Sequence, residues 1–366
     1  MTGAQSLAGA DGRETRAPAR YAYYPGCSLH GTSREFDESL RAVATALGVS
    51  LTEIPDWSCC GASSGHTTDH MLGVALPARN LAIAEEQGFD QVLAPCAACY
   101  NRLSAARLAV ETEEGFAERV PEIIGRPFAN SVEVHNAVEL LRDAAPAIEE
   151  KVAAALAPNP LDGVKMAAYY GCLLVRPFEV CGYDDPEQPT SMDEVIAACG
   201  AEPVDWSMKV ECCGGSFSVS RTASVVRLGR SIIEDARANG AEAIVVACPL
   251  CHSNLDLRQK AMVQRGAKPM PVLFVTQLVG LALGLTPLEL GMPRHFVNTE
   301  PFLADLVQRA KERVAAEQKV KEEAAAKAAA RREKVGAAAP SAGAAASSGA
   351  GAPSGDAGAP EDGEAQ

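Results

Sequence analysis

Two patterns of apolar residues, one typical of strands and one typical of helices, alternate along the first part of the chain. Short apolar runs, typical of buried strands, are followed by stretches in which apolar residues recur with a helical period. The predicted strands cover 21–24, 49–54, 91–94 and the start of 132–141, and the predicted helices cover 33–47, 71–87, 100–110 and the segment that continues to 157. Gly48 and Gly88 follow two of these helices, as expected of residues that end a helix.

The second part of the chain repeats this order. Strands are predicted over 166–170, 243–247 and the start of 272–281, and helices over 191–199 and 222–238, with Gly200 and Gly240 at the helix ends. Strands that alternate with helices indicate a parallel sheet. The chain is therefore predicted to be an α/β protein with two pseudo-symmetric Rossmann-like halves that arose by internal duplication.

The composition changes at both ends and sets the predicted boundaries. Residues 1–20 are predicted to be disordered, 21–160 form the first half, and 161–295 form the second. Residues 296–335 hold a charged, Ala-rich helix that begins near 302, and the Ala/Gly/Ser/Pro-rich tail 336–366 is predicted to be disordered. The C-terminal helix and tail are thus expected to lie outside the duplicated core.

Ten of the twelve cysteines follow one pattern that occurs twice. The spacings are C-x31-CC-x35-C-x2-C and C-x39-CC-x34-C-x2-C, and the matched cysteines lie 145 to 153 residues apart. The first set is Cys27, Cys59, Cys60, Cys96 and Cys99, and the second is Cys172, Cys212, Cys213, Cys248 and Cys251. Because the carboxyl ends of parallel strands meet at one sheet edge, we expect each set to converge there.

Five cysteines in each set limit the kinds of metal site that the chain can form, but they leave more than one kind open. A structural zinc ion and a cubane iron–sulfur cluster each take four cysteine ligands, so five is one too many for either. Adjacent cysteines suit a larger cluster, in which neighbouring thiolates reach different irons. Zinc with one spare thiol per set remains an alternative, as do disulfides or inert cysteines.

Charge and missing motifs limit the function further. The formal net charge of −14 argues against a nucleic-acid partner. The N-terminus has no secretory h-region, and the longest apolar stretch, 272–284, is too short to span a bilayer. We expect a cytoplasmic protein that does not insert into a membrane directly. It has no Cys run for relay clusters, no GxGxxG and no P-loop, so it must exchange electrons through a partner.

The two cysteine sets resemble the duplicated cysteine-rich CCG domain of the heterodisulfide reductase B subunit and its relatives, over about residues 21–285. The resemblance implies that 21–160 and 161–295 are CCG domains, and that each set of five cysteines holds a non-cubane [4Fe-4S] cluster. It further implies a catalytic subunit that reduces a disulfide, of the CoB-S-S-CoM type or another, with a ferredoxin-like iron–sulfur subunit and a flavoprotein subunit as partners. The alternative that it implies is an electron-transfer subunit of a succinate dehydrogenase-, glycolate oxidase- or lactate-utilisation-type complex.

Splitting a disulfide takes two electrons and two protons, so a proton donor is needed beside the cysteines. His30, His66 and His252 lie near them in the sequence and are the candidates, although the favoured interpretation of each is a residue that hydrogen-bonds beside the cysteines or an ordinary polar residue. Of the two remaining cysteines, Cys199 is predicted to be buried, and Cys181, in a Gly/Asp/Pro loop, is a possible surface thiol.

Overall fold

The computed structural model describes residues 19–263 and 266–337 and contains two parallel sheets. The first consists of β1 (Arg20–Tyr23), β2 (Ser50–Glu53), β3 (Gln91–Leu93) and β4 (Glu133–His135), in the order β2-β1-β3-β4. The second consists of β5 (Lys165–Tyr169), β6 (Glu202–Pro203), β7 (Ala243–Val246) and β8 (Val272–Phe274), in the order β6-β5-β7-β8. The two orders correspond strand by strand, which confirms the predicted α/β architecture with two like halves.

Helices connect the strands in both halves. The first half contains α1 (Gly26–His30), α2 (Arg34–Leu47), α3 (Gly65–Thr68), α4 (His70–Glu86), α5 (Ala97–Thr112), α6 (Phe116–Ile124), α7 (Ala137–Asp143) and α8 (Ala145–Ala154). The second contains α9 (Phe178–Cys181), α10 (Ser191–Ala198), the 3-10 helix η1 (Gly215–Phe217), α11 (Thr222–Ala238), α12 (Pro249–Leu257), α13 (Gln259–Met262), α14 (Val275–Ala282) and the 3-10 helix η2 (Met292–Arg294).

Two of the elements that the sequence did not predict, β6 and α3, lack a clear apolar period. Strand β6 is only two residues long and both are exposed, so no apolar run marks it. Helix α3 lies within the Gly/Ser/Thr-rich segment 61–69, whose composition is typical of a loop. Helix α5 begins at Ala97 rather than near residue 100, which makes Cys96 its N-cap and brings Cys99 into its first turn.

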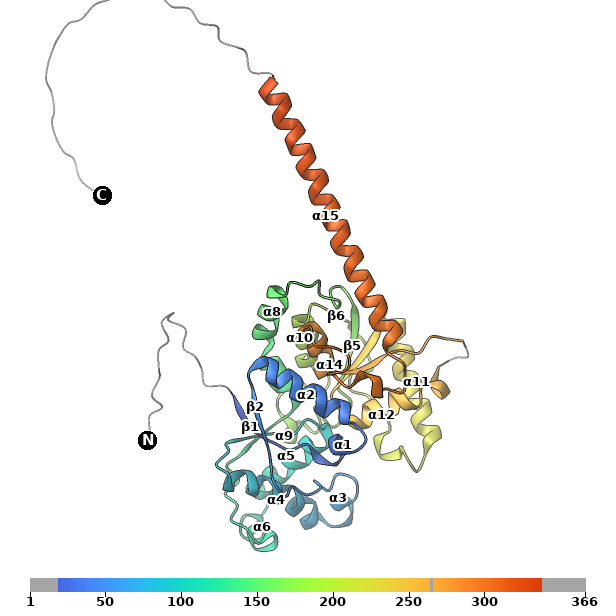
Figure 1. The fold of residues 1–366 in the computed structure, drawn as a ribbon. Helices are drawn as coiled ribbons and strands as arrows, with labels where there is room; N and C mark the ends of the chain where they lie inside the picture. Colours follow the sequence, from blue (N-terminus) through green and yellow to red (C-terminus); the bar gives the residue numbers. More distant parts are fainter. Residues whose placement is uncertain (1–18, 264–265, 338–366) are drawn as a thin grey trace, which may run out of the picture. The chain divides into compact units, whose positions relative to one another are not determined.

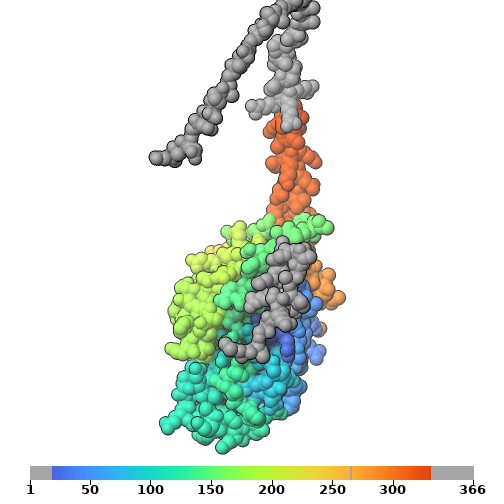
Figure 2. Space-filling model, turned by 90° about the vertical axis from the view of Figure 1, so that its left-hand side faces the viewer, coloured from blue at the N-terminus to red at the C-terminus, as the bar shows by residue number. Residues whose placement is uncertain are grey.

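The two halves share one core. Helix α2 of the first half lies beside α14 of the second, where the rings of Phe36 and Phe274 stack with centroids 4.3 Å apart (Figure 1). The hydroxyl oxygens of Ser39 and Thr276 lie 2.6 Å apart in this buried contact. The space-filling view shows the first half, from blue through cyan to green, adjoining the second, from yellow-green to orange (Figure 2). The duplicated halves are therefore joined by packed apolar and hydrogen-bonded side chains.

The predicted C-terminal helix is present as α15 (Glu300–Ala337). Its start is held to the second half by Arg309, which pairs with Glu242 at 2.8 Å, and by Arg313, which pairs with Asp162 at 3.0 Å. The chain divides into two compact units at Val314, and both sheets belong to the first. The segments predicted to be disordered lie mostly outside the described residues. Residues 19–20 and 336–337 are exceptions, because the Ala19 carbonyl accepts a hydrogen bond from Ser50, Arg20 belongs to β1, and 336–337 belong to α15.

Candidate metal centres

Each cysteine set lies where the strand order of its sheet reverses. Strands β1 and β3 are neighbours, but the chain leaves β1 for β2 on the other side before it returns to β3. Cys27 follows β1 in α1, and Cys96 follows β3 as the N-cap of α5. Cys172 and Cys248 hold the corresponding places after β5 and β7. Such switch points are where open α/β sheets bind their ligands.

Close packing brings the first set together. The Sγ atoms of Cys60 and Cys99 lie 3.4 Å apart, and the backbone N–H of Gly61 donates to Cys59 Sγ at 3.4 Å. Gly26 has a φ of +65°, and a Cβ atom there would lie 2.9 Å from Cys99 Sγ. The turn before Cys27 therefore requires glycine, both for its backbone conformation and for the approach of the thiol.

The second set repeats this geometry. The backbone N–H of Gly214 donates to Cys212 Sγ at 3.3 Å, and a Cβ atom at Gly171 (φ +66°) would lie 3.0 Å from Cys251 Sγ. All five cysteines of the set line one small cavity of about 60 Å³. Ala97, from the first half, also lines this cavity. The second site is thus built at the junction of the two halves.

A tyrosine supports each cysteine pair from behind. The hydroxyl of Tyr24 donates to the carbonyl of Ser58 at 2.8 Å, and that of Tyr169 donates to the carbonyl of Glu211 at 2.6 Å. Each acceptor directly precedes a cysteine pair. These tyrosines were not predicted as part of the sites, although the repeated Tyr-x-Gly-Cys could have revealed them.

Burial follows the same pattern in the cysteine pair and the Cys-x-x-Cys of both sets, while the first cysteine is exposed in the first set and half-buried in the second. The second cysteine of each pair and both cysteines of each Cys-x-x-Cys are buried, whereas Cys59 and Cys212 are exposed. Hydrogen bonding from the neighbouring Cys99 thiol lowers the pKa of Cys60 to about 7, and bonding from Cys172 lowers the pKa of Cys212 to about 6. The hydrogen-bonded partners, Cys99 and Cys172, have a raised pKa in turn, because each donates to a neighbouring thiolate. Ionising every thiol of a set is therefore unfavourable unless a cation balances the negative charges. The donor sets therefore fit a metal centre.

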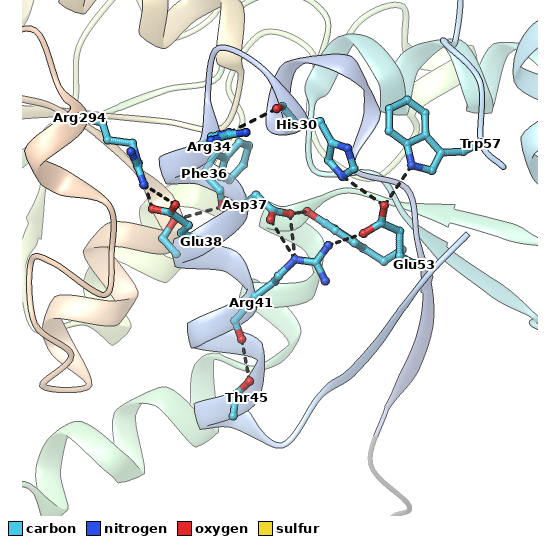
Figure 3. A network of polar contacts seen from close by, with 12 residues as sticks. His30, Arg34, Phe36, Asp37, Glu38, Arg41, Thr45, Glu53, Trp57 and Arg294 are labelled. Atoms are coloured by element: carbon cyan, nitrogen blue, oxygen red, sulfur yellow. Dashed lines mark hydrogen bonds and ion pairs between the residues drawn. The ribbon is translucent and has the colours of Figure 1, made fainter. Parts of the chain in front are cut away.

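The three candidate histidines have different surroundings. His30 is half-exposed, its Nε2 lies 3.2 Å from Glu53 Oε1, and its ring meets Trp57 edge to face (Figure 3). His66 is exposed, with Nδ1 3.2 Å from the carbonyl oxygen of Gly61. His252 is buried against the ring of Phe274, and its Nε2 lies 3.1 Å from the carbonyl oxygen of Val272. Burial holds the pKa of His252 well below its usual range.

The two remaining cysteines are both buried. Cys199 is fully buried, as predicted. The prediction that Cys181 could be a surface thiol is wrong, because α9 ends at this residue and turns it into the junction between the halves. There the hydroxyl of Tyr100 donates to the Cys181 carbonyl at 2.8 Å, and the Asn101 amide lies 3.5 Å from its Sγ. Burial raises the pKa of this thiol to about 11.

A buried ion pair behind the second set was also missed. Lys209 Nζ lies 3.2 Å from both carboxylate oxygens of Asp193, and the hydroxyl of Tyr170 donates to the same carboxylate at 2.7 Å. Tyr170 lines the cavity of the second set. The corresponding position to Lys209 in the first half is Asp56, which is exposed. Three charged or polar residues far apart in the sequence give no local signal of such a pair.

Comparisons with known proteins agree with this geometry. The CCG cysteine-rich domain matches twice, over residues 21–104 and 166–256. The 8-methylmenaquinol:fumarate reductase membrane anchor subunit of Wolinella succinogenes is 31% identical, over 76% of this chain and 97% of the relative. The B subunit of the ferredoxin:CoB-CoM heterodisulfide reductase of Methanosarcina mazei is 30% identical, over 77% of this chain and 95% of the relative.

A solved structure shares the fold. The crystal structure of a hypothetical protein from Helicobacter pylori superposes with a TM-score of 0.60, at 13% identity, over 77% of this chain and 52% of that one. In the part of the chain that the structure describes, no helix combines the length and apolar character needed to cross a membrane.

The matched domains and the named relatives support an iron–sulfur oxidoreductase subunit. Both CCG matches lie within the two halves, and the relatives align over most of the described chain. The chain belongs to the family of proteins with two cysteine-rich CCG domains that includes the heterodisulfide reductase B subunits.

Proposed function

We propose that the chain holds two non-cubane [4Fe-4S] clusters, one per set of five cysteines, and reduces a disulfide as the catalytic subunit of a heterodisulfide reductase-like complex. The observation that carries the proposal is the convergence of all five cysteines of the second set on one cavity, with a matching arrangement in the first. A zinc ion would leave one of five converging thiols without a role.

The cysteines of the first set (Cys27, Cys59, Cys60, Cys96 and Cys99) and those of the second (Cys172, Cys212, Cys213, Cys248 and Cys251) would be the ligands. When bound, each cluster supplies a one-electron centre, so two centres match the two electrons that a disulfide takes up. The amides of Gly61 and Gly214 stabilise the thiolates of Cys59 and Cys212 by donating to them. The exposed cysteines leave one side of each site open to a substrate.

Reduction also consumes two protons, and His30 is the candidate best placed to supply one. It lies in the same short helix as Cys27 and is open to solvent, and Glu53 fixes its ring through Nε2. Glu53 also accepts hydrogen bonds from Trp57 at 3.1 Å and Arg41 at 2.7 Å, which hold the carboxylate in place (Figure 3). His66 is a second exposed candidate, whereas buried His252 is more suited to packing.

The partners proposed are a ferredoxin-like iron–sulfur subunit and, behind it, a flavoprotein subunit. The names of the heterodisulfide reductase relatives motivate the ferredoxin-like subunit, since they mention ferredoxin together with the B subunit, and the flavoprotein subunit is an expectation from the family resemblance. The described chain leaves only Cys181 and Cys199 outside the two sets, and both are buried. The chain would thus receive its electrons from another protein.

The relative from Wolinella succinogenes favours a second candidate function, which is electron transfer in a quinol-linked complex without disulfide reduction. Protein purified without oxygen separates the two. The proposal expects about eight irons with matching sulfide per chain, and turnover of a disulfide with reduced methyl viologen. Clusters without disulfide turnover would support the second candidate, and zinc without sulfide would refute both.

A further inference from the structure

The second cysteine set lies beneath a group of exposed apolar side chains that the first set lacks. Leu250, between Cys248 and Cys251, is 39% exposed and lines the cavity of the set. Phe217 and Val219, after the cysteine pair, are exposed, as is Leu257 on α12. A Cβ atom at Gly215 would lie 3.5 Å from Leu250 Cδ1, so η1 packs directly against the start of α12.

Two arginines border these apolar side chains. The backbone N–H of Arg221 donates to the Phe217 carbonyl at 2.9 Å, and Arg258 Nη2 donates to the Ser218 carbonyl at 2.5 Å. Within the described residues, neither guanidinium has a carboxylate partner in an ion pair. We call this surface the basic face and define it as Phe217, Val219, Arg221, Leu250, Leu257 and Arg258.

The charge of the basic face is opposite to that of the chain. Between its cysteine pair and its last strand, the second half (212–271) carries eight basic and four acidic residues. The same interval of the first half (59–132) carries five basic and nine acidic residues. A locally basic, partly apolar surface in a chain of net charge −14 is complementary to an acidic protein surface.

We propose that the basic face docks an acidic, ferredoxin-like iron–sulfur protein, which delivers electrons to the chain at the second cysteine set. The inference rests on the proposed function, because it takes that set to be a redox centre. One electron passes at a time, so that the partner is oxidised, the chain is reduced, and no proton or bond needs to move. The electrons would enter at the second set, and the first set, with polar surroundings, would be farther along the route.

The residues of the first half that correspond to the basic face support the entry of electrons at the second set rather than the first. Leu250 corresponds to Ala98, which is buried, and Phe217 corresponds to Ser64, which is exposed and polar. An apolar centre within a polar rim, with arginine enriched, is the usual composition of a protein interface. An anionic membrane is the other surface that could accept this composition, and vesicle binding separates the two.

The test compares the full-length iron-loaded chain with two variants that carry the same change in net charge. Arg221→Glu/Arg258→Glu alters the basic face, and Arg119→Glu/Lys151→Glu alters exposed positions of the first half. The probe is a reduced ferredoxin, with binding measured as Kd and electron transfer as the rate at which the chain is reduced. Reduced methyl viologen, which needs no docking site, measures the clusters themselves.

The expected result is at least about a tenfold weaker Kd and a slower rate with ferredoxin for the basic-face variant only, with a wild-type affinity that falls steeply as salt rises. Iron content and reduction by methyl viologen should not change. Equal behaviour of the two variants, or no ferredoxin binding by the wild type, would overturn the proposal. A basic-face variant that no longer binds phosphatidylglycerol vesicles, but binds ferredoxin with the wild-type Kd, would also overturn it. Failure of methyl viologen to reduce the wild-type chain would instead refute the proposed function.

Discussion

The two cysteine sets have the same framework and opposite surroundings. In both, a glycine lets a thiol approach the turn after the first strand, a tyrosine hydroxyl holds the residue before the cysteine pair, and a backbone amide donates to an exposed thiol. Around this framework, the segment between the cysteine pair and the last strand is acidic in the first half (59–132) and basic in the second (212–271), and exposed apolar side chains lie beside the second set. The shared part therefore fits a common metal chemistry, and the divergent part fits contact with different molecules.

The two halves are expected to differ most in the effect on stability of a substitution at Lys209, because the corresponding residue of the first half is the exposed Asp56. Replacing Lys209 with Met leaves Asp193, whose side chain is only 15% exposed, without its cation, so we expect a loss of about 3 kcal/mol in the free energy of unfolding. The matched variant is Arg79→Met, which breaks the exposed pair with Asp56 and should cost less than about 1 kcal/mol. Denaturant unfolding of the iron-loaded protein measures both. Equal losses would show that the buried pair does not distinguish the halves.

The glycines test the shared part of the framework. Gly26→Ala and Gly171→Ala each force a side chain into the left-handed region and against a cysteine Sγ atom. We expect each to cost about 2 kcal/mol and to lower the iron content of the chain. Gly48→Ala is the control, because its φ of +73° is similar but nothing lies within 4 Å of the new Cβ, so only about 1 kcal/mol should be lost. If Gly48→Ala lowered the iron content as much as the other two variants do, the close contact between the glycine and a cysteine Sγ atom would not explain the loss of iron.

A pH-dependent effect of similar size is expected from His295 in the second half. Burial lowers the pKa of His295 to about 4, so below pH 6.5 the unfolded state binds a proton that the folded state does not. Stability from this group is therefore present above pH 6.5 and is lost as pH falls, by about 2 kcal/mol at pH 5. The nearby Asp256, whose pKa burial raises to about 6, acts in the opposite direction.

Comparing variants isolates the contribution of His295, because Asp256 is present in all of them. His295→Gln should lose less melting temperature between pH 7 and pH 5 than the wild type does. His70→Gln, at an exposed first-half position, should follow the wild type. If both variants follow the wild type, the buried histidine does not set the acid sensitivity of the second half.

Much of the framework could be predicted because its signals are local. A cysteine pair, a Cys-x-x-Cys and a strand followed by a helix are contiguous patterns, and parallel sheets bring strand ends together. The four glycines expected to end helices (Gly48, Gly88, Gly200 and Gly240) do have positive φ. Local patterns were therefore sufficient for the fold and for the convergence of the cysteines.

What the sequence did not reveal depends on long-range packing. Cys181 was placed at the surface because its loop is polar, yet Tyr100 and Asn101 from the other half cover it. Lys209 and Asp193 are separated by a strand and two turns, and only the folded chain brings them together. The basic face combines residues in and just after η1 with residues in and just after α12. These two segments are separated in the sequence by α11 and β7, so no local pattern indicates that they lie side by side.

The central claim is that each half holds its own cluster, and selective removal of one set tests it most directly. Iron and acid-labile sulfide should be measured per chain, without oxygen, for the wild type and for Cys60→Ser/Cys99→Ser and Cys213→Ser/Cys251→Ser. Four irons per cluster predict about eight irons in the wild type and about four in each variant, with matching sulfide. A wild type with zinc and no sulfide, or a variant of one set that empties both, would contradict the account.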